Sequence, residues 1–279
     1  MDAYETAPQV DVIIPCYQLL AFNKHHFEDL VSSLCTPENR VYIHRIIVIN
    51  DDPQEDIASF IELVCNEKNI YAKVQLVQIT HCLGQGAARN LGASYAKASY
   101  LHFIDQDDFI TKDFYQQVLF PKVDCGLASL VVYDHGQLRK HHRLWTDWWY
   151  KRASKVADLS FFMFANLAVS PGQYVIKKRV YEEIGGFPDL KNKGSDDFGF
   201  LFQLCESNAT FSFADKAIFY HRLHEHQGKK QLNITLSVKE FLNTIAKPKR
   251  FFLRINHQLR RYVFFEQVLS KICYKLFFS

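Results

Sequence analysis

Apolar residues along the first 110 positions follow two alternating periods. Four short apolar runs have the length of buried strands and end in polar or turn-forming residues, at positions 10–15, 45–49, 74–79 and 100–104. Three segments between them carry apolar residues at every third or fourth position, as helices do, at 27–34, 57–65 and 84–98. Strands that alternate with helices of this length predict an α/β fold, with a mostly parallel sheet flanked by helices.

The pattern is less regular after about residue 125. We expect a strand at 173–176, a turn at 185–188 and a helix at 196–206. From residue 233 onward the chain is basic and aromatic, with helical spacing. The pattern therefore predicts a globular domain over residues 1–230 and a basic helical extension over residues 231–279.

Polar clusters follow three of the predicted strands, at the point where each strand ends. They are Pro15-Cys16-Tyr17, Asn50-Asp51-Asp52 and Asp105-Gln106-Asp107-Asp108. The carboxyl ends of parallel strands meet at one edge of a sheet, and ligands of open α/β sheets bind beyond that edge. We therefore expect the three clusters to converge on one functional edge.

The composition is that of a folded protein with a sizeable core. Of 279 residues, 48% are apolar and 15% are aromatic, which excludes a disordered chain. Seven cysteines, an odd number without C-x-x-C spacing, favour a reducing compartment over a disulfide framework. The first residues lack the pattern of a secretion signal, and the uncharged stretch 159–176 contains Pro171 and Gly172. We expect a cytoplasmic protein in which this stretch is buried.

Charge is unevenly distributed along the chain. Residues 247–279 hold eight Lys or Arg residues and one Glu, a net charge of +7, whereas the whole chain has +3. Apolar residues recur at helical spacing between them, which is typical of a peripheral amphipathic helix on an anionic membrane. A helix that packs on the domain or forms a homodimer fits equally well. Nucleic acid is disfavoured as a partner, because no base-reading motif accompanies the charge.

Three carboxylates in four residues repel one another unless a cation or hydrogen-bond donors offset their charge. In Asp105-Gln106-Asp107-Asp108 they could hold Mg²⁺ or Mn²⁺, which share their ligand shell with phosphates. Alternatively, Asp108 caps a helix that begins near Thr111, and the other carboxylates are solvated.

The segment Gly84-Gln85-Gly86 partly matches a dinucleotide-binding fingerprint. Arg89 stands at its sixth position, where that fingerprint needs Gly or Ala. The Arg89 guanidinium could instead bind phosphates, or it could face solvent. A nicotinamide-dependent oxidoreductase is therefore one alternative function.

Two further groups could carry chemistry. Asp196 and Asp197 begin a predicted helix. Their negative charges either interact favourably with the helix dipole, or one of the two serves as a general base. His221, His224 and His226 have spacing that could ligate a metal, although a tetrahedral site needs more ligands. Taken alone, the two aspartates favour the dipole interpretation. For the histidines, one residue that assists a phosphate or metal is favoured over a full histidine cluster.

Six segments in order resemble the motifs of the family-2 inverting glycosyltransferases of the GT-A fold. They are V-I-I-P-C-Y at 12–17, I-I-V-I-N-D-D at 46–52, A-R-N-L-G at 88–92, F-I-D-Q-D-D at 103–108, G-G-F at 185–187 with D-D at 196–197, and Y-H-R-L-H at 220–224. The fourth is similar to the family's D-x-D motif. The likeness covers about residues 9–226, and the order and spacing of the segments are specific although each alone is weak.

The resemblance implies an activity. A sugar would move, with inversion, from a nucleotide-diphosphate sugar to a hydroxyl of a glycan or lipid-linked glycan, in polysaccharide or lipopolysaccharide biosynthesis. A UDP-sugar is the favoured donor, and Mg²⁺ or Mn²⁺ is the implied cofactor. A catalytically inactive module that binds nucleotide-sugars is a second alternative.

The resemblance also implies residue roles. Asp197 would be the catalytic base, Asp107 would bind the metal, and His224 would reach the metal or the diphosphate. Asp51 would accept a hydrogen bond from the base of the nucleotide. The residues implied to lie around the nucleotide are Pro15, Cys16, Tyr17, Asp51, Arg89, Asp105 and Asp107.

Overall fold

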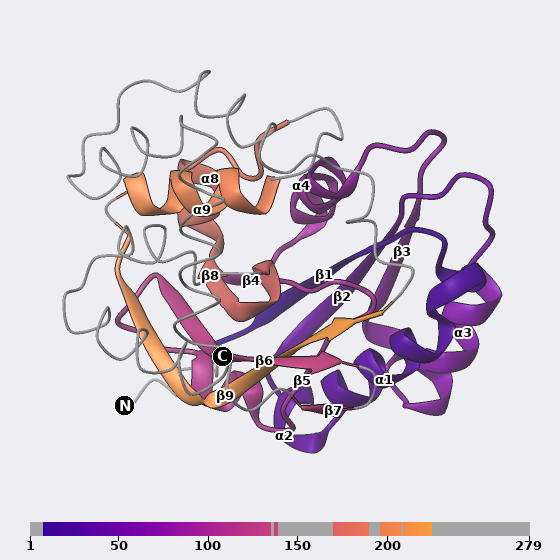
Figure 1. Cartoon of the computed structure of the whole chain (residues 1–279), viewed down its shortest axis with the longest axis horizontal. Coiled ribbons are helices and arrows are strands. Elements are labelled where there is room, and N and C mark those ends of the chain that lie inside the picture. Colours follow the sequence, from indigo (N-terminus) through magenta and orange to yellow (C-terminus); the bar gives the residue numbers. More distant parts are fainter. Residues whose placement is uncertain (1–7, 135–136, 139–169, 190–195, 208, 225–279) are drawn as a thin grey trace, which may run out of the picture.

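A computed structural model describes residues 8–134, 137–138, 170–189, 196–207 and 209–224 (Figure 1). In these residues nine strands form one sheet, in the order β3-β2-β1-β4-β8-β6-β9-β5, with β7 paired to β6. The strands are β1 (Val10–Cys16), β2 (Ile43–Asn50), β3 (Val74–Gln78), β4 (Tyr100–Phe103), β5 (Phe109–Ile110), β6 (Cys125–Asp134), β7 (Gln137–Leu138), β8 (Tyr174–Lys177) and β9 (Phe211–Leu223).

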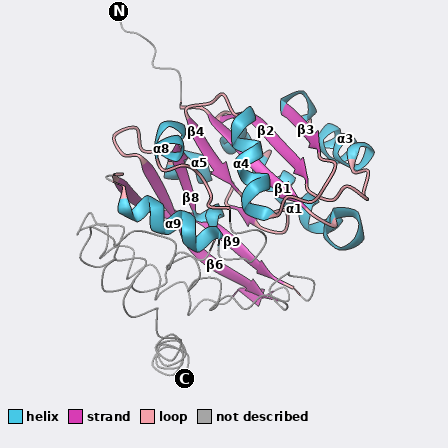
Figure 2. Cartoon of the chain, turned by 90° about the horizontal axis from the view of Figure 1, so that it is seen from above, coloured by secondary structure: helices cyan, strands magenta, loops and turns pink. Residues whose placement is uncertain are grey.

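Helices cover both faces of the sheet (Figure 1). On one face lie α4 (Gln85–Tyr95), α8 (Lys178–Glu183) and α9 (Asp196–Glu206), and the view from above shows α4 and α9 over the strands (Figure 2). The other face carries α1 (Lys24–Leu34), α2 (Pro37–Arg40), α3 (Ala58–Glu67) and α5 (Phe114–Val118). Short helical turns η1 (Leu19–Asn23), η2 (Tyr71–Lys73) and η3 (Pro171–Gln173) join these elements.

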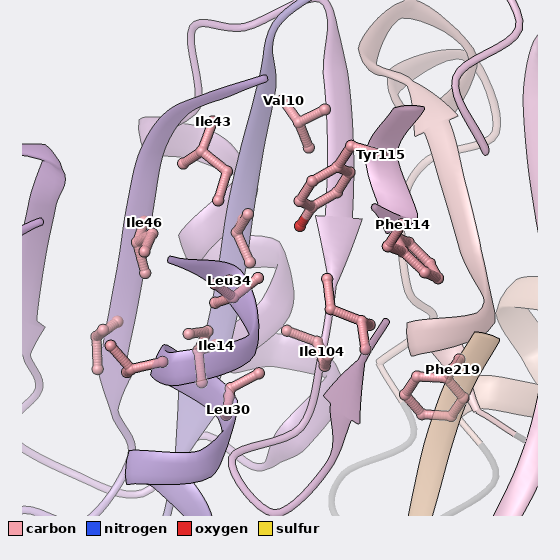
Figure 3. Close-up of a cluster of buried hydrophobic side chains, with 14 of the residues drawn as sticks. Val10, Ile14, Leu30, Leu34, Ile43, Ile46, Ile104, Phe114, Tyr115 and Phe219 are labelled. Carbon is pink, nitrogen blue, oxygen red and sulfur yellow. The ribbon is translucent and has the colours of Figure 1, made fainter. Parts of the chain in front are cut away.

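Strands β1 and β4 are buried along their whole length, on both faces of the sheet. In β1, Ile13 packs against the α4 side, whereas Val12 and Ile14 pack against the α1 side. The close-up of the α1 side shows Ile14 near Leu30 (Figure 3). A strand buried on both faces has no polar alternation, and this explains the continuous apolar runs of the sequence.

A buried polar bridge crosses the α5 side of the sheet. His102 of β4 is fully buried, with Nδ1 2.9 Å from the Tyr115 hydroxyl and Nε2 3.0 Å from the Gly172 carbonyl oxygen. Burial lowers the pKa of His102 to about 4, so the ring is neutral near pH 7. The ring donates from Nε2 to the carbonyl and accepts the hydroxyl at Nδ1, which ties β4 to α5 and η3.

The α/β class predicted from the sequence is confirmed, and so is the parallel pairing of its first half. Strands β3, β2, β1 and β4 are mutually parallel, as expected. The second half differs, because β8 is antiparallel to both β4 and β6. The long strands β6 and β9, which pair in parallel, were not predicted.

One of the two interpretations of Asp108 was wrong. Asp108 does not cap a helix near Thr111, since α5 begins at Phe114 and follows Asp113. The Asp108 carboxylate instead accepts the backbone N–H of Arg222 at 2.8 Å, so it joins the β4 end to β9.

Several sequence-based expectations fall outside the described residues. These concern residues 159–169 of the uncharged stretch, His226 and the helical extension 231–279. The domain division and the membrane role of the extension therefore stay predictions. Among the helices that the structure does describe, none combines the length and apolar character needed to span a membrane.

Small residues let α4 approach the sheet closely. A Cβ added at Gly92 would lie 2.4 Å from Cγ2 of Ile13, well inside van der Waals contact. Gly84 precedes the helix with a φ of 88°, a left-handed conformation that glycine adopts without strain. The helix is thereby held at a fixed height above β1 and β2.

We predict that Gly92→Ala destabilises the protein. Alanine favours a helix interior by about 1 kcal/mol over glycine, but overpacking against Ile13 costs about 1–3 kcal/mol. Urea unfolding should give a lower midpoint than wild type. Ser94→Ala, on the exposed side of the same helix, is the control and should leave stability nearly unchanged. A Gly92→Ala variant as stable as wild type would contradict the close packing.

Candidate active site

The ends of β1 and β2 form one part of the site. The Asp51 N–H donates to the Cys16 carbonyl oxygen at 2.7 Å, which continues the strand pairing to the edge of the sheet. Pro15 and Cys16 are buried, whereas Tyr17 is 47% exposed. Of these three predicted nucleotide contacts, Tyr17 therefore presents its side chain at the edge.

Asp51 fixes the loop that leads into α4. Its carboxylate accepts the backbone N–H groups of Leu83 at 2.7 Å and Gly84 at 2.9 Å. Burial raises the pKa of Asp51, and these two hydrogen bonds oppose the rise. Because both amides are engaged by Asp51, this glycine loop does not present them to a phosphate as a dinucleotide-binding loop would.

The segment after β4 is tied to the end of β1. The Gln106 side chain accepts the Tyr17 N–H at 3.1 Å and donates to the Tyr17 carbonyl oxygen at 2.8 Å. Each of Asp105, Asp107 and Asp108 offers an oxygen, and these oxygens lie within 4.8 Å of one another. The predicted convergence of strand ends is therefore present in the structure.

Carboxylate oxygens of this kind are the donor set that Mg²⁺ and Mn²⁺ prefer, so the residues present fit such an ion. A divalent cation would offset the mutual repulsion of Asp105, Asp107 and Asp108. Burial raises the pKa of Asp108 to about 6, although His221 opposes the rise. Asp108 also holds the Arg222 backbone, which gives it a structural task beside any role in the ion site.

His224 reaches the same segment from the end of β9. Its Nε2 lies 2.7 Å from Asp107 Oδ2, and its Nδ1 is buried without a hydrogen-bond partner in the described part of the chain. Burial opposes ionisation of Asp107, but the hydrogen bond and charge of His224 lower the pKa of this carboxyl. The His26 ring packs against His224, with 4.9 Å between ring centroids.

Arg89 joins three carboxylates from two parts of the chain. Its Nη2 lies 2.6 Å from Asp105 Oδ1, and its Nη1 lies 2.7 Å from Asp197 Oδ1 and 3.0 Å from Asp196 Oδ2. Although burial opposes the charge, Asp105, Asp197 and Asp196 raise the pKa of Arg89. The Arg89 side chain is fully buried, so it does not face solvent as one sequence interpretation allowed.

Asp197 is the more exposed of the two aspartates that begin α9. Its side chain retains 36% of its exposure, compared with 14% for Asp196. Burial raises the pKa of Asp197 to about 7, against the opposing effect of Arg89. A carboxylate near half-ionisation at neutral pH has the acidity suited to a general base.

The structure adds residues that the sequence analysis did not single out as functional. Gln106 bridges β1 and β4, and Gln85 donates to Asp105 Oδ1 at 2.9 Å. Asn90 holds the backbone of Phe187 with bonds of 2.8 Å and 2.9 Å. Gln106 and Asn90 lie inside recognised motifs, which could have marked them, but nothing in the sequence connects His26 with His224.

Known glycosyltransferases are similar in sequence to this chain. A family model described as "Glycosyltransferase like family 2" matches residues 11–271. The amylovoran biosynthesis glycosyltransferase AmsB of Erwinia amylovora is 31% identical over 108 residues, which cover 39% of this chain and 34% of AmsB. The minor teichoic acid biosynthesis protein GgaB of Bacillus subtilis is 29% identical over 115 residues, which cover 39% of this chain and 11% of GgaB. The alignments thus span about a third or less of these two relatives.

Solved structures have the same fold. The crystal structure of S. aureus TarS residues 1–349 in complex with UDP-GlcNAc matches with a TM-score of 0.64 and 16% identity, covering 92% of this chain and 73% of that one. A second crystal structure of S. aureus TarS residues 1–349 matches with a TM-score of 0.62. The expected GT-A fold is thereby confirmed, and a nicotinamide-dependent oxidoreductase loses its support. With the family model covering most of its length, the chain belongs to the family-2-like glycosyltransferases.

Proposed function

We propose that the protein transfers a sugar, with inversion, from a nucleotide-diphosphate sugar to an acceptor hydroxyl. The observation that carries the proposal is the hydrogen-bonded chain along one sheet edge. Asp51 holds the start of α4, Arg89 of α4 holds Asp105, and the same guanidinium holds Asp197. Groups that could bind the nucleobase, face the diphosphate and accept the proton of the acceptor hydroxyl are therefore linked along this edge.

A UDP-sugar is the donor we favour. Tyr17 is exposed at the β1 end and Asp51 follows β2, so these two residues would flank the base and ribose. Asp105 and Asp107 would lie toward the diphosphate, with Arg89 behind Asp105. The similarity to TarS, which was solved with UDP-GlcNAc, supports a UDP-sugar and makes UDP-GlcNAc the first donor to test.

Mg²⁺ or Mn²⁺ would be held by Asp107, with Asp105 and Asp108 beside it and His224 against Asp107. When bound, such an ion acts as a Lewis acid that offsets the negative charge of the departing nucleoside diphosphate. The chain's own part is to orient these oxygens: Gln85 and Arg89 fix Asp105, and His224 fixes Asp107.

Asp197 is our candidate for the general base. A sugar hydroxyl is a weak nucleophile, so removal of its proton during attack lowers the barrier. The acceptor oxygen forms its bond to the anomeric carbon while the bond to the diphosphate breaks, and the proton passes to Asp197. One displacement inverts the configuration and needs no covalent enzyme intermediate.

The acceptor we favour is a glycan or lipid-linked glycan. Two relatives are named for teichoic acid and amylovoran biosynthesis, which supports a role in making a bacterial polysaccharide. The basic, amphipathic pattern of residues 247–279 supports a peripheral position on an anionic membrane, at its cytoplasmic face. Packing on the domain or homodimer formation remains the alternative use of this segment.

Asp197→Asn should abolish transfer while leaving donor binding nearly intact. The amide keeps the shape of the side chain but takes no proton, so kcat should fall by at least about 100-fold. Turnover of UDP-GlcNAc and other UDP-sugars is measured with Mn²⁺, and donor affinity is measured by calorimetry. Glu62→Gln on the exposed face of α3 is the matched control. Parallel loss of donor affinity would assign Asp197 a different role, and a wild type without turnover would favour an inactive binding module.

The rate should depend on pH through the same group. Burial raises the pKa of Asp197 to about 7, and only the ionised form accepts a proton. We expect kcat/KM, which reports ionisation of the free enzyme, to fall with decreasing pH below about 7 and to level off above it. The profile is measured with Mn²⁺ at donor concentrations well below KM. A midpoint near the ordinary aspartate value of about 4 would contradict this role.

Asp107→Ala should remove the metal-dependent part of nucleotide binding. Without its carboxylate the ion site loses a ligand that His224 holds in place. Calorimetry of UDP in Mn²⁺ and in EDTA should give a large difference for wild type and for Glu62→Ala, and almost none for Asp107→Ala. An unchanged difference in the Asp107→Ala variant would reject this metal ligand.

A further inference from the structure

Arg89 lies between the candidate base and the donor side of the site. Its two terminal nitrogens point to different partners, Nη2 to Asp105 and Nη1 to the aspartates of α9. We propose that Arg89 is a positioning residue for the transfer, an inference that rests on the proposed function of Asp197. It sets the orientation of Asp197 relative to Asp105 and acts through these carboxylates, without contacting the donor itself.

The burial of Arg89 supports an indirect role. The side chain is fully buried, whereas Asp105 and Asp197 retain 18% and 36% of their side-chain exposure. The two carboxylates are therefore the groups that meet ligands at the sheet edge, and the guanidinium lies behind them. A buried cation is stable only with paired anions, so each position depends on the others.

The rest of the guanidinium environment fixes its direction. The Arg89 Cζ lies 5.1 Å from the centre of the Phe187 ring, and Asn90 holds both backbone polar groups of Phe187. A Cβ at Gly86 would lie 3.0 Å from Asp196 Oδ2, so glycine at this position lets α9 approach α4. The A-R-N and G-G-F motifs thus form one support for the guanidinium.

This geometry requires arginine, and it distinguishes the two carboxylate oxygens of Asp197. A planar guanidinium donates in two directions at once, whereas a lysine ammonium is a single point of charge. Nη1 engages Oδ1 of Asp197, so we assign proton abstraction to Oδ2. Arg89 Nε is buried and makes no hydrogen bond within the described residues, an unmatched donor of the kind tolerated where an arrangement serves function.

The test separates an effect on turnover from an effect on donor binding. Arg89→Lys keeps the charge but cannot bridge Asp105 and Asp197, so kcat should fall by about 100-fold or more, as for other small misplacements of catalytic groups. The calorimetric Kd of the UDP-sugar that wild type turns over, with Mn²⁺, should stay within about threefold. Arg45→Lys on β2, whose side chain bonds Gln75, is the matched control.

A second variant keeps the test decisive if Arg89→Lys does not fold. Phe187→Leu removes the ring beneath the guanidinium and should lower kcat without weakening donor binding. Turnover should also be non-additive: Arg89→Lys should add little to Asp197→Asn, because both act through one group. Loss confined to donor affinity, or unchanged kcat in the folded variants, would overturn the positioning role. In that case, turnover by the wild type and its loss in the Asp197→Asn variant would still support the proposed transferase activity.

Discussion

The pairing of one buried guanidinium with three carboxylates is the interaction on which the site depends. Arg89 has no access to water, so its charge is stable only because Asp105, Asp196 and Asp197 surround it. These partners come from the end of β4 and the start of α9, and Arg89 itself comes from α4. A requirement of simple electrostatics therefore brings the three elements to one edge of the sheet.

Burial and neighbouring charge then give chemically similar aspartates different properties. His224 lowers the pKa of Asp107 despite its burial, which keeps this carboxylate charged and suited to bind a cation. Burial raises the pKa of Asp197 to about 7, which suits the role of general base that we propose for it. Environments that separate the pKa values of neighbouring acids are a recurrent means of dividing tasks within one site.

The sequence predicts the first half of the fold well, because β1 to β4 are short, mainly apolar segments separated by helices. It does not predict β6 and β9, whose pairing joins residues such as Leu127 and Phe213 from distant parts of the chain. The site shows the same limit. The position of Asp105 after a strand is visible locally, but the contact between Arg89 and Asp197 crosses 108 positions and follows only from tertiary packing.

Helix α4 connects two parts of the site, which in the proposed reaction would contact the nucleobase and the acceptor hydroxyl. Asp51 fixes the residues just before this helix through the Leu83 and Gly84 amides, and Arg89 projects from its second turn toward Asp197. The packing of Gly92 against Ile13 keeps the helix from shifting between these two anchors. Since a closely packed helix moves as a unit, a displacement at Asp51 is transmitted to Asp197. The glycines and the arginine of this segment therefore hold a fixed distance between Asp51 and Asp197.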